Sequence, residues 1–113
     1  MKWHTVYFSA TAKEAIQAWP QSIKKDLGSV ITTLQKGANV GMPDVKPMPL
    51  VSKGVFEIRI KDHSGAYRAF YLIENKKGIF VFHAFKKKTQ KTPKKEIELG
   101  KKRLNSMIKE LSL

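Results

Sequence analysis

The sequence predicts a single α+β domain over residues 1–113, in which helices pack on an antiparallel sheet. Three observations carry this prediction. Residues 23–34 hold an apolar stripe at helical spacing, residues 54–85 hold three strand-like segments separated by turn signals, and residues 92–111 hold a second helical stripe. Hydrophobic residues make up 42% of the chain, which is enough for one core at this length.

The first part of the chain predicts a strand followed by a helical hairpin. Residues 2–8 (KWHTVYF) are rich in aromatic and β-branched residues, which favour a strand. Ser9 or Thr11 then caps a helix that begins near Ala12. Pro20 separates this helix from the next, because a residue before proline disfavours the helical backbone. The second helix carries one apolar stripe, made of Ile23, Leu27, Val30, Ile31 and Leu34.

Residues 38–53 hold three prolines and a glycine, which predicts an ordered loop. Its apolar residues are expected to pack on the core: Met42, Val45, Met48 and Leu50.

Three segments after this loop predict an antiparallel meander. Residues 54–62 (GVFEIRIKD) alternate strictly between apolar and polar side chains. Residues 66–74 (AYRAFYLIE) are apolar on both faces, as in a central strand, and residues 78–85 (GIFVFHAF) form the third strand. The connections, HSG at 63–65 and NKKG at 75–78, are turn signals. The polar face of the first strand carries Glu57, Arg59 and Lys61.

Thr92 and Pro93 predict the start of the last helix, as an N-cap followed by a first-turn proline. Acidic residues near its start and basic residues further on suit the helix dipole. Its core-facing stripe is expected to be Ile97, Leu104, Ile108 and Leu111. The predicted order is therefore β-α-α-β-β-β-α.

The net charge of +13 is the strongest compositional signal, and +8 of it falls in residues 71–113. A positive field of this size favours a polyanionic partner, most often nucleic acid or the ribosome. A solubility role, or an acidic protein partner, would also account for it.

Several classes of site are excluded or disfavoured. The chain has no cysteine, which excludes disulfides, Cys-ligated zinc and thiol nucleophiles. His4, His63 and His83 lack metal-ligand spacing, so neither a metal nor a cofactor is expected. No apolar run is long enough for a signal peptide or a membrane span, which predicts a cytoplasmic protein without membrane contact.

A polar row on an otherwise apolar sheet predicts the functional site. Arg68 lies in a run of apolar and aromatic neighbours, one strand away from Glu57 and Arg59. If the meander forms, these side chains converge with the lysines that close the third strand, and converging cations suit a phosphate. A structural interpretation stays open for each: the arginines as partners of acidic residues, and the lysines as a solvated strand end.

Other residues are weaker candidates. Tyr71 lies beside cations, as base stacking requires, although tyrosine is more often a packing residue. His83 is a candidate catalyst, although histidines of this kind are more often structural. Contacts to RNA are expected from Lys61, Lys86, Lys88, Lys91 and Tyr71. Strand alternation allows only one of Lys86 and Lys87 on the face of Arg59.

Four linked motifs in residues 46–104 carry a family resemblance: PL followed by GVFEIR, GAYRAFY, FKKKTQKTP and EIELGKKR. At this spacing they resemble the RelE/ParE superfamily of bacterial toxins, and within it the phage-derived HigB-like branch. The resemblance implies a compact RelE-like domain and a type II toxin–antitoxin system. It also implies a ribosome-dependent mRNA endoribonuclease that cuts the message in the A site without a metal, by attack of a 2′-hydroxyl on the adjacent phosphate. The implied partner is a helix-turn-helix antitoxin of the HigA-like kind.

Carried over by position, the resemblance places Arg59, Arg68 and Lys87 near the phosphate, with Lys86 as a substitute for Lys87. Two departures leave the general acid and base unassigned. Glu57 stands where RelE has lysine, and the C-terminal tyrosine of RelE has no counterpart, since Pro93 lies near that place. Candidates for the proton transfers are Glu57, His83 and Lys61.

Two other functions remain open from the sequence. The ParE branch shares the fold and inhibits gyrase without enzymatic activity. Charge and aromatic content alone would also suit an RNA-binding module that has no activity.

Overall fold

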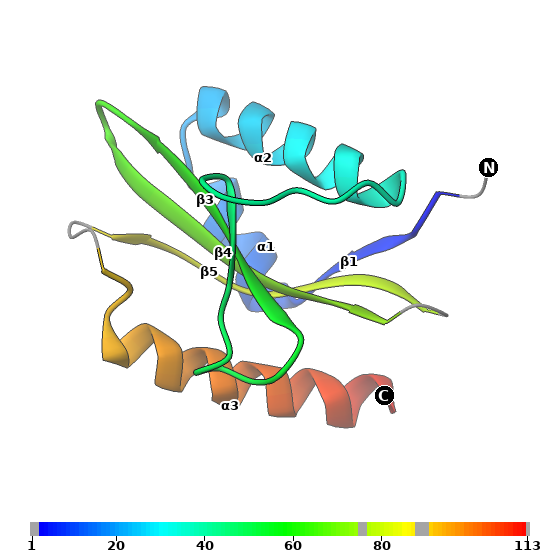
Figure 1. Cartoon of the computed structure of the whole chain (residues 1–113). Helices are drawn as coiled ribbons and strands as arrows, with labels where there is room; N and C mark the ends of the chain where they lie inside the picture. Colours follow the sequence, from blue (N-terminus) through cyan, green and yellow to red (C-terminus); the bar gives the residue numbers. More distant parts are fainter. Residues whose placement is uncertain (1–2, 75–76, 88–90, 113) are drawn as a thin grey trace.

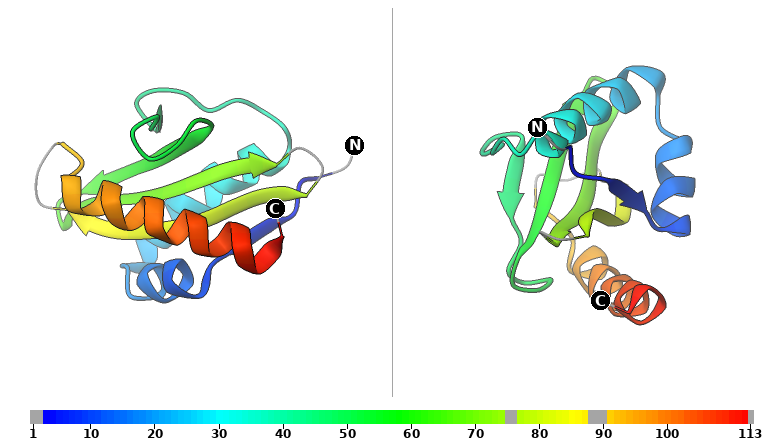
Figure 2. Two further views of the ribbon diagram at one scale, coloured as in Figure 1. Left: turned by 90° about the horizontal axis from the view of Figure 1, so that it is seen from below. Right: turned by 90° about the vertical axis from the view of Figure 1, so that its right-hand side faces the viewer.

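The fold, taken from a computed structural model that describes residues 3–74, 77–87 and 91–112, is a sheet between two helical layers. Helices α1 and α2 cover one face of the sheet, and α3 crosses the other (Figures 1 and 2). The five strands lie in the order β1-β5-β4-β3-β2. The elements are β1 (Val6–Phe8), α1 (Ala10–Gln17), α2 (Gln21–Gln35), β2 (Val45–Pro47), β3 (Val55–Asp62), β4 (Gly65–Glu74), β5 (Gly78–Lys87) and α3 (Lys94–Leu111).

The predicted α+β class, element order and central meander are confirmed. Strands β3, β4 and β5 pair antiparallel, and Asp62 closes the first turn by accepting a 2.7 Å hydrogen bond from the amide of Ser64. Two features add to the prediction: β1 pairs parallel with β5, and β2 forms inside the predicted loop, antiparallel to β3. The second predicted turn, 75–78, lies partly outside the described residues.

Strand β1 is shorter than predicted. Of the predicted span 2–8, residue 2 lies outside the described residues, and pairing with β5 begins only at Val6. Two residues before that point, His4 bonds to α2. The amide of His4 donates to the carbonyl of Gln35 at 2.8 Å, and the Gln35 side chain donates back to the His4 carbonyl at 3.0 Å.

The helical hairpin forms as predicted and packs on one face of the sheet. The Ser9 hydroxyl accepts from the amide of Ala12 at 3.2 Å, so Ser9 is the N-cap and α1 starts two residues earlier than expected. Four residues of the α2 stripe are fully buried: Ile23, Leu27, Ile31 and Leu34. They pack on apolar side chains of the meander, which include Ile58, Tyr67, Ala69 and Val81.

The segment before β3 packs less completely than expected. Val45 is buried because it pairs with Ile58 of β3, and Met48 joins the core on the α3 side. Met42 and Leu50 are 62% and 67% exposed, so their predicted packing is wrong. Both lie just outside β2, where no strand pairing fixes them against the sheet.

Helix α3 packs on the second face through its central residues. Leu104 and Met107 are buried, while Leu111 at the predicted end of the stripe is 44% exposed. Gly100 faces the buried ring of Phe70 so closely that a Cβ there would lie 2.7 Å from a ring carbon. In the described part of the chain, no helix is long and apolar enough to cross a membrane.

Candidate active site

A buried carboxylate and two arginines meet on the α3 side of β3 and β4. Arg59 and Arg68 are direct cross-strand neighbours, and Glu57 lies two residues before Arg59 on the same face. The Nε atom of each arginine lies 3.6 Å from Oε1 of Glu57. The Glu57 and Arg68 side chains are 1% and 4% exposed, and that of Arg59 is 22% exposed. Strand alternation therefore brings these three residues together as expected.

The two guanidinium groups keep unused hydrogen-bonding capacity. Among the described residues, the buried Nε atoms of Arg59 and Arg68 have no hydrogen-bond partner. Burial lowers the pKa of Arg68, the positive charge of Arg59 adds to this effect, and the negative charge of Glu57 opposes it. A buried donor without a partner is costly in a folded protein, so an incoming anionic oxygen would be stabilised here.

Thr92 holds the other oxygen of the carboxylate, a role that the sequence did not predict. Its hydroxyl donates to Oε2 of Glu57 at 2.7 Å. The predicted N-cap role of Thr92 is wrong, because Pro93 occupies that position and no side chain caps the helix. A threonine before a helix-starting proline is an ordinary capping signal, and nothing local indicates a partner 35 residues earlier in the chain.

Lys87, and not Lys86, shares the face of the arginines. Lys87 is opposite Ala66 on β4, which is itself opposite Lys61 on β3, so all three lie on the α3 side. The Lys86 ammonium instead lies 5.6 Å from the ring centre of Tyr67 on the hairpin side. The prediction that Lys86 could substitute for Lys87 is wrong, because the two side chains are on opposite faces.

Lys87 is 4% exposed, which is unusual for lysine. Burial and the positive charge of Arg68 lower its pKa, the negative charge of Glu57 partly opposes them, and the resulting pKa is about 8. Lys87 therefore exchanges its proton close to neutral pH.

Two predicted residues do not reach this cluster. Tyr71 is 2% exposed and packs against Phe56 on the hairpin side, with ring centres 5.7 Å apart. Its predicted stacking on a base is wrong because the ring is covered. His83 is buried, and its Nε2 lies 2.8 Å from Oε1 of Glu96 on α3. Burial lowers the pKa of His83 and the bond to Glu96 opposes this, so the geometry favours its structural interpretation.

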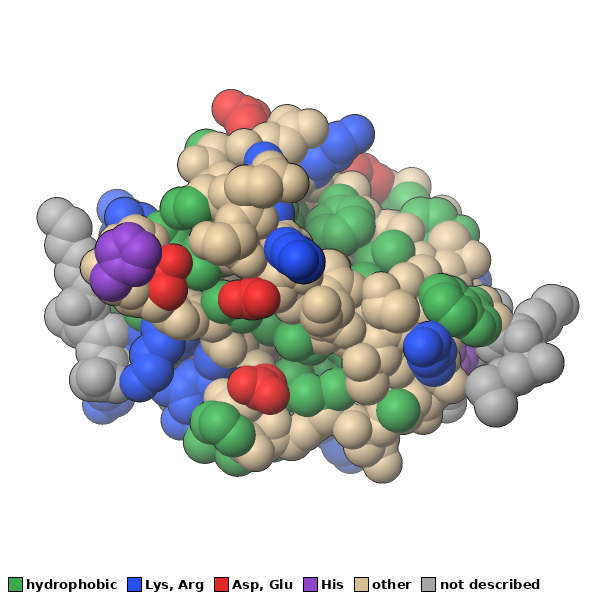
Figure 3. Space-filling view, turned by 90° about the horizontal axis from the view of Figure 1, so that it is seen from above, with side chains coloured by type: hydrophobic (Ala, Val, Ile, Leu, Met, Phe, Trp, Pro, Cys, Tyr) green, Lys and Arg blue, Asp and Glu red, His purple; other side chains and the backbone are tan. Residues whose placement is uncertain are grey.

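The remaining basic candidates lie around the cluster or outside the described chain. Lys61 is exposed at the end of β3, and Lys91 is exposed just before α3. Lys88 lies outside the described residues. Figure 3 shows one group of lysine and arginine side chains at the left of the view, with further basic and acidic side chains scattered over the same face.

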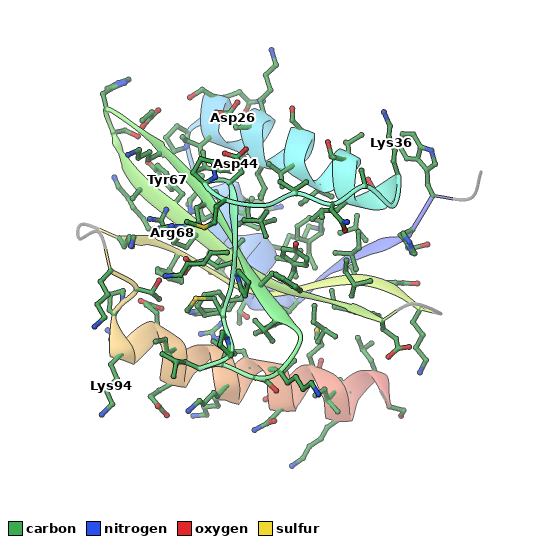
Figure 4. The ribbon with its side chains drawn as sticks, viewed as in Figure 1. Asp26, Lys36, Asp44, Tyr67, Arg68 and Lys94 are labelled. Carbon is green, nitrogen blue, oxygen red and sulfur yellow. The ribbon has the colours of Figure 1, made fainter. Side chains whose placement is uncertain are left out.

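A cavity of about 550 Å³ adjoins the arginines. It lies between α2, the segment before β2 and the second half of β3, and no pattern in the sequence predicts it. Its lining residues are Asp26, Ser29, Val30, Pro43, Asp44, Arg59, Ile60, Lys61 and Arg68. Figure 4 shows Asp26 and Asp44 above Arg68 in the left half of the view, with Lys36 well to the right. Over the described residues, no three His, Asp or Glu side chains gather as a metal site would require.

Comparison with known proteins gives one family match. The sequence model of the family "Phage derived protein Gp49-like (DUF891)" matches residues 14–105. The comparison with curated protein sequences gives no significant match.

Two solved structures share the fold. One is the toxin–antitoxin complex RelBE2 from Mycobacterium tuberculosis, where a chain matches with 20% identity and a TM-score of 0.55, over 75% of this chain and 99% of the other. The second is E. coli toxin RelE, a double arginine-to-alanine mutant in the free state, with 17% identity and a TM-score of 0.54, over 96% of this chain and 99% of the other. These similarities establish a RelE-like fold.

Proposed function

The chain belongs to the Gp49-like family of phage-derived proteins, and from this premise we propose that it is a toxin of a type II toxin–antitoxin system that cleaves mRNA on the ribosome. The observation that carries the proposal is the cluster of Arg59, Arg68 and Lys87 around the buried carboxylate of Glu57. Three cations against one carboxylate leave a local excess of positive charge, which suits a phosphodiester. The RelE-like fold supports the toxin class, since both similar structures contain toxins.

In the proposed reaction, the arginines hold the non-bridging oxygens of one phosphate. The 2′-oxygen of the preceding ribose attacks phosphorus, and the bond from phosphorus to the 5′-oxygen breaks. The products are a 2′,3′-cyclic phosphate and a 5′-hydroxyl. Negative charge grows on the phosphoryl oxygens in the transition state, where fixed cations stabilise it most.

Lys87 is the proposed proton donor to the leaving 5′-oxygen. Its pKa of about 8 leaves it mostly protonated at neutral pH and still acidic enough to release the proton. Glu57 has a different part: tied to both arginines and to Thr92, it fixes the orientation of the guanidinium groups. The base that removes the 2′-hydroxyl proton comes from the remaining candidates, of which exposed Lys61 lies on the correct face.

The motifs in residues 46–104 support placement in the HigB-like branch of the RelE/ParE superfamily, with the ribosomal A site as the place of cleavage in the cytoplasm. They also support a helix-turn-helix, HigA-like antitoxin as the partner. One of the two similar structures is a complex of toxin and antitoxin, which agrees with an antitoxin partner.

The test is cleavage of a defined mRNA in a translating extract. The wild-type protein is expected to cut the message, and Arg68→Ala to cut it about 100-fold more slowly, because one donor to the transition state is lost. Lys36→Ala is the matched control, since it removes one exposed positive charge at the opposite end of the molecule (Figure 4). Intact message together with trapped gyrase complexes, or wild-type cleavage by Arg68→Ala, would contradict the proposal.

A further inference from the structure

The cavity beside the arginines presents opposite charges on different walls. Arg59 and Arg68 contribute from the sheet, Asp26 from α2, and Asp44 from the segment before β2. Among the described residues, neither aspartate forms an ion pair with any of these cations. The cavity therefore holds separate sites for an anion and for a hydrogen-bond donor.

Arg68, one of the residues that line this cavity, has a buried donor atom without a hydrogen bond. The Arg68 side chain is 4% exposed, it lines the cavity, and its Nε makes no hydrogen bond to any described residue. A native protein rarely leaves such an atom unsatisfied unless a ligand supplies the acceptor. This observation is independent of the aspartates: the Nε lies 3.6 Å from Oε1 of Glu57, and an anionic oxygen that reached it would supply the missing hydrogen bond.

The size and position of the cavity suit one nucleotide. Small-molecule sites typically enclose about 300–1,000 Å³, and this cavity has about 550 Å³. It lies beside β3 at the point where the pairing of β3 with β2 ends. Just beyond the paired residues, the Arg59 amide donates to the Asp44 carbonyl at 2.8 Å. Apolar side chains between the charged walls, Val30 and Ile60, can cover the faces of a base.

We infer that this cavity holds one nucleotide of the RNA, with its phosphate on the arginines and a guanine base against Asp26 and Asp44. The inference rests on the proposed function, because it takes the phosphate to be part of an RNA chain. Carboxylates only accept hydrogen bonds. Guanine is the one base with two adjacent donors, a ring N–H and an exocyclic amino group, on its pairing edge.

The other bases fit the carboxylates less well. Adenine and cytosine place an accepting ring nitrogen beside the amino group, and uracil places its N–H between two carbonyl oxygens. Each of these acceptors repels a carboxylate, so only guanine forms two parallel hydrogen bonds with it. A two-bond contact to a base edge discriminates by about 1–3 kcal/mol, which is roughly 5- to 150-fold.

Nucleotide binding to the isolated protein tests the pocket without any cleavage. In an NMR titration, 5′-GMP is expected to bind at least about tenfold more tightly than 5′-UMP and to shift the amides of Asp44, Arg59 and Lys61. Asp26→Asn and Asp44→Asn should remove most of this difference, because an amide offers a single acceptor oxygen. Glu14→Gln, which removes an exposed charge on α1, is the matched control. Equal affinity for both nucleotides, or no binding of either, overturns the inference.

Cleavage mapping separates failure of the pocket from failure of the proposed function. Sequencing of 5′ ends on translated messages should show an enrichment of guanine of about tenfold at one position beside the cut, lost in Asp26→Asn with Asp44→Asn and kept in Glu14→Gln. Cleavage without such an enrichment, or with an enrichment that survives both substitutions, contradicts the guanine pocket but agrees with the proposed nuclease activity. Absence of cleavage overturns the nuclease, and the comparison of 5′-GMP with 5′-UMP then decides on the pocket.

Discussion

Glu57 organises the proposed site through its two carboxylate oxygens. One oxygen faces the Nε atoms of Arg59 and Arg68 at 3.6 Å, and the other accepts from Thr92 at 2.7 Å. A carboxylate that is 1% exposed needs such partners, because an unpaired buried charge is strongly destabilising. Strand alternation predicted its meeting with the arginines, whereas the threonine comes from a distant segment and was not predictable.

Replacing Thr92 by valine tests whether this hydroxyl is needed. Thr92→Val keeps the side-chain shape and leaves Oε2 of Glu57 without its donor, so the free energy of unfolding should fall by about 1–3 kcal/mol. Thr33→Val is the control, since that hydroxyl bonds only to an exposed helix carbonyl. Urea unfolding measures both variants. Equal losses of unfolding free energy in the two variants would mean that the bond to Glu57 stabilises the fold no more than the exposed bond of Thr33 does.

The low pKa of Lys87 predicts how cleavage depends on pH. Its active form is the protonated one, present below a pKa of about 8 and lost above it, so the cleavage rate should fall as the pH rises through about 8. Lys87→Arg should remove this fall, because arginine stays charged, and should be slower throughout, because a guanidinium is a poor proton donor. The measurement is the initial rate from about pH 6.5 to about pH 9. A rate that rises through about pH 8 would exclude Lys87 as the donor.

At the scale of elements, a bulge in β5 determines which lysine reaches the site. Phe70 is opposite His83, yet Tyr71 is opposite Val81, so Phe82 is an extra residue in β5. Phe82 and His83 consequently both face the α3 side, and the alternation that follows places Lys87 there as well. The sequence predicted the strand and its period of two. It could not decide between the lysines, because nothing in GIFVFHAF marks the extra residue.

Two helical glycines should respond to alanine in opposite directions. In Gly100→Ala the new Cβ would lie 2.7 Å from the buried Phe70 ring, so α3 must shift and the free energy of unfolding should fall by about 1–3 kcal/mol. In Gly28→Ala nothing lies within 4 Å of the new Cβ. The better helix propensity of alanine should therefore raise the free energy of unfolding by about 0.5–1 kcal/mol. Urea unfolding of both proteins measures the pair. Stabilisation by Gly100→Ala would show that α3 does not pack this closely on the sheet.

At the scale of the whole molecule, the cavity is the feature that the sequence could not predict. Asp26, Asp44 and Arg68 come from α2, from the segment before β2 and from β4, and only the packing of α2 over the sheet brings them together. The helices, the meander and the polar row follow from local periodicity, which each segment carries by itself. Contacts between distant segments have no such local signal.

The net charge of +13 and the RelE-like fold limit the possible functions without selecting one. Charge favours a polyanionic partner, and the fold is shared with solved structures of toxins. The choice of chemistry rests on the cluster, where three cations and an ordered carboxylate can stabilise a phosphoryl transition state.

The most direct test of this choice uses a ribosome-bound message with a single 2′-deoxy nucleotide before the bond that is cut. The proposed mechanism predicts that this message stays intact at that bond, while the all-ribose message is cut to a 2′,3′-cyclic phosphate and a 5′-hydroxyl. Cleavage of the deoxy message at the same bond and rate, or products with a 5′-phosphate, would contradict 2′-hydroxyl attack at the cluster of Arg59, Arg68 and Lys87.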